Sequence, residues 1–129
     1  MKNPKILPVS LALVLGIAIM AMVTLVQHAP APPEGEYHWS KLLQNNFGWL
    51  AVLLQVAAGF ALGYYFRLNA FVTGLCLIAI FPITSTVEAT VHRGSHNLIP
   101  VEIAMHLAYA LPAAIAAFAG GRLAGKKQA

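Results

Sequence analysis

Ionisable residues gather in one short part of this chain. Only 9% of its residues are charged, yet positions 88 to 106 hold two glutamates, three histidines and an arginine: Glu88, His92, Arg93, His96, Glu102 and His106. Imidazole and carboxylate groups together can bind transition metals, relay protons or recognise cations. We therefore take this stretch as the candidate functional site.

The spacing of these residues indicates how they could meet. Glu88 and His92 are four residues apart, as are Glu102 and His106, so each pair shares one face of a helix. If the two helices are antiparallel neighbours, Glu88 stands level with His106, and His92 with Glu102, because four residues rise about 6 Å. The pattern predicts two stacked Glu/His pairs, with His96 in the loop above them.

One interpretation of the cluster is a site that binds or transports a small ion or polar solute. Glu88 and His106 would form it, and Gln55 and Thr84 are further polar candidates in neighbouring apolar segments. His106 carries most weight, because ionisable groups inside membrane helices are costly and usually functional.

A second interpretation is a metal-dependent membrane enzyme. A divalent transition metal such as zinc, iron, copper or manganese would be held by Glu88, His92, Glu102 and His106, with His96 as a further ligand. The ligand types suit such a metal, but the spacing matches no established zinc pattern. Di-iron bundles place Glu and His three residues apart rather than four. No catalytic motif is present, so no catalytic residue is assigned.

A third interpretation is structural, with the chain serving as an accessory subunit of a larger membrane complex. Glu102 follows Pro100 and would then simply be an acid in the first turn of a helix, where the helix dipole favours it. Arg93 would neutralise Glu88 at the level of the lipid headgroups.

Composition decides the class of protein that carries this cluster. Of 129 residues, 59% are hydrophobic, more than a soluble domain of this size can bury. Four apolar segments are each about 20 residues long, which is the length of a membrane-crossing helix. We expect an all-α, single-domain protein over residues 1–129, with four transmembrane helices in an up-down bundle at about 6–26, 47–66, 68–87 and 101–119. Residues 6–26 could instead be a secretory signal, but that apolar run exceeds the usual core of a signal peptide.

Smaller features refine this prediction. Pro82 and Pro112 should kink the third and fourth helices. The outer loop 27–46 should contain a short interfacial helix from about Trp39 to Gln44. Gly59 and Gly63 in the second segment, and the many alanines of the fourth, favour close helix packing or self-association.

The basic residues predict an orientation. One side of the predicted bundle would hold six of them and the other only Lys41 and Arg93; the six are Lys2, Lys5, Arg67, Arg122, Lys126 and Lys127. The positive-inside rule then places both termini in the cytoplasm, and the Glu/His residues on the outer, periplasmic side of an inner membrane. Lipids are the expected surroundings, and a homo-oligomer or a membrane complex the expected assembly. The scattered cations form no nucleic-acid-binding stripe.

Overall fold

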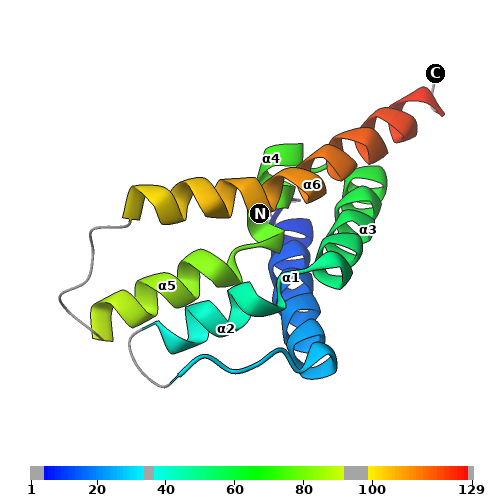
Figure 1. Cartoon of the computed structure of the whole chain (residues 1–129). Helices are drawn as coiled ribbons and strands as arrows, with labels where there is room; N and C mark the ends of the chain where they lie inside the picture. Colours follow the sequence, from blue (N-terminus) through cyan, green and yellow to red (C-terminus); the bar gives the residue numbers. More distant parts are fainter. Residues whose placement is uncertain (1–4, 34–36, 92–98, 128–129) are drawn as a thin grey trace.

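The computed structural model of the chain describes residues 5–33, 37–91 and 99–127, and in these ranges it contains helices and no strand. Six helices follow one another: α1 (Ile6–Gln27), α2 (His38–Asn46), α3 (Trp49–Phe66), α4 (Ala70–Leu77), α5 (Ile80–Val91) and α6 (Ile99–Lys126). Figure 1 shows α1 and α3 standing beside each other, while α2 and α5 extend to one side of them. The all-helical fold and the short helix at α2 confirm the sequence predictions.

Three helices are long and apolar enough to cross a membrane, namely α1, α3 and the part of α6 from Pro100 to Lys126. The predicted third span is instead two helices, α4 and α5, which meet at an angle of 51°. Neither α4, with 8 residues, nor α5, with 12, reaches across the hydrocarbon core alone. The described chain therefore has three candidate spans, or four if the bent pair counts as one.

The break between α4 and α5 follows from Pro82. Proline has no N–H with which to bond the carbonyl four residues earlier, and its ring crowds that turn. The carbonyl of Ile78 accepts a hydrogen bond from Phe81 instead, at 3.0 Å, which tightens the chain at this point. Pro112 has a milder effect, because α6 continues through it. Figure 1 shows the two halves of α6 pointing in different directions.

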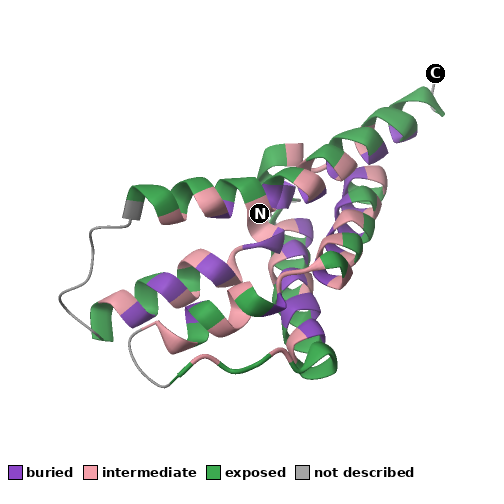
Figure 2. Cartoon of the chain, viewed as in Figure 1, coloured by how far each residue is buried: buried purple, intermediate pink, exposed green. Residues whose placement is uncertain are grey.

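Large apolar side chains cover much of the outside of the molecule. Leu25 on α1 is 72% exposed and Trp49 on α3 is 82% exposed. At most 33% of the apolar part of any candidate span is buried within the chain, and Figure 2 shows buried residues only along the inward faces of these helices. Helices that are apolar on every face are typical of a lipid environment.

Small residues hold the helices together. A Cβ atom at Gly59 of α3 would lie 2.5 Å from the carbonyl oxygen of Ala113 on α6, and one at Gly63 would collide with Ala117. Gly120 of α6 makes the reciprocal approach to the backbone at Phe60. The predicted glycine pair therefore faces α6, where the absence of side chains lets the two backbones touch.

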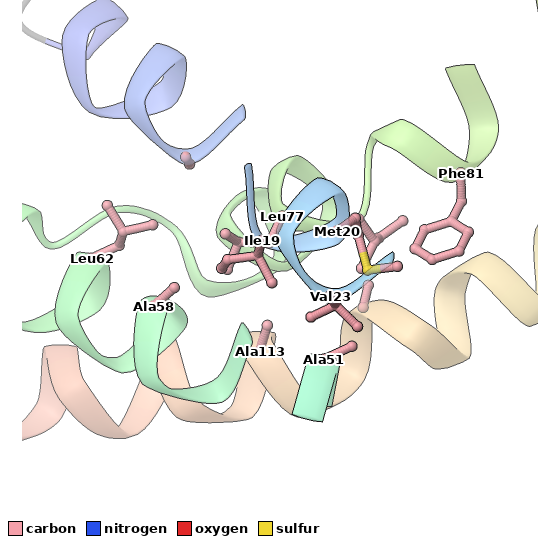
Figure 3. Close-up of a cluster of buried hydrophobic side chains, with 12 residues drawn as sticks. Ile19, Met20, Val23, Ala51, Ala58, Leu62, Leu77, Phe81 and Ala113 are labelled. Carbon is pink, nitrogen blue, oxygen red and sulfur yellow. The ribbon is translucent and has the colours of Figure 1, made fainter. Parts of the chain in front are cut away.

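The buried apolar side chains meet where α1, α3, α4 and α6 converge. Figure 3 shows Ile19 of α1 beside Leu77, at the end of α4, and Val23 of α1 beside Ala51 of α3. Gly16 of α1 lies against the backbone of Leu77. This core fixes the end of α4, and with it the direction in which α5 leaves.

We predict that Gly63→Ala destabilises the protein by about 1–3 kcal/mol, because the added methyl group overpacks the contact between α3 and α6. Gly125→Ala is the matched control, since a Cβ there meets no atom within 4 Å. Thermal unfolding in detergent measures both variants. Equal unfolding temperatures for the two would contradict close packing at Gly63.

Candidate functional site

Glu88 of α5 caps the N-terminus of α2. The backbone N–H of Trp39 donates to its Oε1 at 2.6 Å, and the N–H of Ser40 donates to its Oε2 at 3.1 Å. These are the second and third residues of α2, whose amides lack partners within the helix. Tyr37, at the N-cap position, supplies no side-chain capping bond. A carboxylate from another helix therefore does the work of a local cap.

Two serines complete this arrangement. The Ser40 hydroxyl donates to Oε2 of Glu88 at 2.5 Å and lies 3.3 Å from the Ser85 hydroxyl, one turn earlier on α5. All three side chains are buried. The positive end of the α2 dipole favours the negative charge of the carboxylate. The Glu88 carboxylate is thus stabilised by hydrogen bonds from α2.

The position of α5 explains why Glu88 is turned towards α2. Figure 1 shows α2 and α5 lying side by side, with the N-terminal half of α6 on the other side of α5. The buried residues of α5 are Phe81, Ser85 and Glu88, and the last two face α2 through the bonds above. The sequence placed Glu88 level with His106 across a helix seam, whereas the hydrogen bonds of its carboxylate go to α2.

His106 lies on α6 beside a group of aromatic rings. It is only 7% exposed, and its ring centre is 6.2 Å from that of Phe81. Phe81 packs edge-on against Tyr109 at 5.2 Å, and Tyr109 stacks on Phe47 at 4.1 Å. Within the described residues, the buried Nε2 atom of His106 has no hydrogen-bond partner, and the same is true of His38 Nδ1, Asn46 Oδ1 and Gln55 Oε1. His106 is thus an ionisable side chain whose ring nitrogen Nε2 lies unbonded beside apolar rings.

Two other predicted binding residues have structural partners. Gln55 is fully buried and donates from Nε2 to the carbonyl of Leu77 at 3.5 Å. That carbonyl belongs to the end of α4, where the break leaves it outside the regular helix ladder. Thr84 donates to the carbonyl of Ile80 in its own helix at 2.7 Å. Both therefore satisfy backbone carbonyls near the α4–α5 bend.

The predicted metal ligands are only partly visible. His92 and His96 lie outside the described residues. Among those that are described, no three side chains of His, Cys, Asp or Glu lie close enough together to hold a metal ion. Glu102, half-buried in the first turn of α6, stands one turn before His106. A metal at His106 would thus need ligands beyond those that the described part of the chain brings together.

Ser40 and Ser85 are the site residues that the sequence analysis missed. A partial signal was available, because no Ser, Thr, Asp or Asn stands at position 37, where α2 needs a cap. The sequence could not predict that Glu88 is the capping residue, because Glu88 is 48 residues away from Ser40.

Comparisons with known proteins do not add to this geometry. No protein-family model matches the sequence, and no curated protein or solved structure is significantly similar to it.

We predict that Glu88→Gln weakens the attachment of α2 and lowers the free energy of unfolding by about 1–3 kcal/mol, because the NH₂ group that replaces one carboxylate oxygen cannot accept a bond from α2 and leaves a buried donor unsatisfied. Limited proteolysis should then cut α2 faster than in the wild type. Glu102→Gln is the control, since no such cap depends on Glu102. If both variants unfold alike, Glu88 does not anchor α2.

Proposed function

We propose that this chain is an integral membrane protein that binds a small cation or polar solute at His106. The observation that supports this function most directly is the buried, unpaired Nε2 atom of His106. A buried polar atom without a partner costs about 1–3 kcal/mol, and an ionisable group within a membrane-crossing helix is a candidate functional site. The imidazole can donate or accept at Nε2, depending on its tautomer, so the ligand supplies the complementary group.

The role of Glu88 in this proposal differs from the one expected from sequence. Its carboxylate holds α2 against α5, and α5 in turn supplies Phe81, which packs beside His106. Glu88 therefore acts as a positioning residue for the wall of the site. Glu102, four residues before His106 on the same face of α6, is the acid best placed to favour a cationic ligand.

The proposed topology follows the distribution of charge. Six basic residues lie at the termini and at the α3–α4 turn, against two on the opposite side, which favours cytoplasmic termini and an inner-membrane location. In this orientation α4 and α5 together form one bent crossing, the third of four along the chain. His106 then lies in the outer half of the membrane, within reach of solutes from the periplasmic side.

The test is the unfolding temperature of the purified protein with chloride salts of Zn²⁺, Cu²⁺, Mn²⁺, NH₄⁺ or K⁺, compared between the wild type and His106→Leu. A ligand at 100 times its Kd stabilises by about 2.7 kcal/mol. We expect one class of cation to stabilise the wild type, and this response to disappear in His106→Leu.

The same variant separates binding from a structural role. Without ligand, His106→Leu should be at least as stable as the wild type, because it removes an unpaired polar group from apolar surroundings. His28→Asn, at an exposed histidine that ends α1, controls for nonspecific binding to histidine. A stabilising cation whose effect survives His106→Leu, or a marked loss of stability in that variant alone, would contradict the proposal.

A further inference from the structure

A basic hollow lies at the end of the molecule opposite α2. It is an open depression of about 540 Å³ between the start of α4 and the last turns of α6, and it is lined by three cations, Arg67, Arg122 and Lys126, with small and apolar residues between them. Figure 1 shows this end of α6 running beside the end of α3. Neither of the two acids in the described part of the chain, Glu88 and Glu102, lines the hollow. Its charge therefore favours an anion.

Two of the cations are held in place. The guanidinium of Arg67 donates to the carbonyl of Ala124 at 3.2 Å, which leaves most of its five N–H groups for a ligand. The guanidinium of Arg122 lies over the ring of Phe118, with its carbon 5.1 Å from the ring centre. Such stacking orients the guanidinium without neutralising it.

The floor of the hollow suits a hydrocarbon chain. Gly121 and Gly125, four residues apart on α6, leave room along the helix beyond the buried Ala117, while Leu68 and Phe118 add apolar walls. Arg67 directly follows α3, and Lys126 ends α6. Both candidate spans thus end here, at the depth where lipid phosphates lie.

We propose that this hollow binds one anionic glycerophospholipid, with its phosphate between Arg67, Arg122 and Lys126 and an acyl chain along the small residues of α6. Basic pockets between membrane helices are suited to such headgroups. The occupant is a lipid because cationic and apolar surfaces are joined in one hollow, whereas free phosphate would use the cations alone.

The neighbouring Lys127 supplies a matched control. Its ammonium group lies 5.6 Å from the ring centre of Tyr64, so it is directed away from the hollow. A hydrogen bond to the Tyr64 side chain raises the pKa of Lys127, which keeps it cationic. Lys126→Gln and Lys127→Gln therefore remove the same charge from adjacent positions, but only the first removes a lining residue.

Native mass spectrometry of the detergent-purified full chain tests the proposal, with phosphatidylglycerol and phosphatidylcholine of identical acyl chains as probes. We expect one phosphatidylglycerol to bind in preference to phosphatidylcholine. Arg122→Gln and Lys126→Gln should each weaken it roughly fivefold, as expected for one cation near a lipid surface. Lys127→Gln should retain wild-type binding.

Three results would overturn the proposal. Equal binding of the two lipids would remove the role of charge. Equal losses in Lys126→Gln and Lys127→Gln would indicate a diffuse basic surface rather than this hollow. Displacement of phosphatidylglycerol by inorganic phosphate or glycerol phosphate at similar concentrations would identify a free phosphate as the ligand.

Discussion

The packing of α2 against α5 depends on the hydrogen bonds between Glu88 and the N-terminus of α2. Ser40, whose amide is one of the two that donate to Glu88, is buried away from water, and Tyr37 at the N-cap position supplies no side-chain capping bond. The carboxylate meets both needs, because it satisfies two amides and is itself stabilised by the helix dipole. By joining α2 to α5 it also holds Phe81 beside His106, so an acid that looked like a ligand from sequence is a structural link.

Much of the fold was predictable, because its causes are local in the sequence. The lengths of the apolar segments predicted α1 and α3 within two residues at each end, whereas the segment predicted at 101–119 stops seven residues before the end of α6 at Lys126. The glycine spacing at Gly59 and Gly63 correctly indicated close helix packing, and Pro82 correctly marked a bend. The degree of that bend was not predictable. It depends on how the core around Leu77 fixes the end of α4 and on the attraction between α5 and α2, which involve residues far apart in the chain.

The candidate site was predicted only in part. Spacing correctly placed Glu102 and His106 one turn apart on a helix, but pairing Glu88 with His106 assumed that α5 and α6 pack as straight antiparallel neighbours. The bend at Pro82 instead turns α5 beside α2. Gln55 and Thr84 each donate a hydrogen bond to a backbone carbonyl near the bend. Among the described residues, four buried side-chain atoms lack a hydrogen-bond partner: His38 Nδ1, Asn46 Oδ1, Gln55 Oε1 and His106 Nε2. His106 is the ionisable one of these that lies within a candidate span.

The central claim is that the Glu88 carboxylate is hydrogen-bonded to α2, while His106 is available to bind a ligand. Double-mutant cycles on the free energy of unfolding test it directly, by combining Glu88→Gln first with Ser40→Ala and then with His106→Leu. Residues in one hydrogen-bonded network couple by about 0.5–3 kcal/mol, while independent residues add within about 0.5 kcal/mol. The account predicts coupling of Glu88 to Ser40 and additivity of Glu88 with His106. Strong coupling to His106 and none to Ser40 would contradict it.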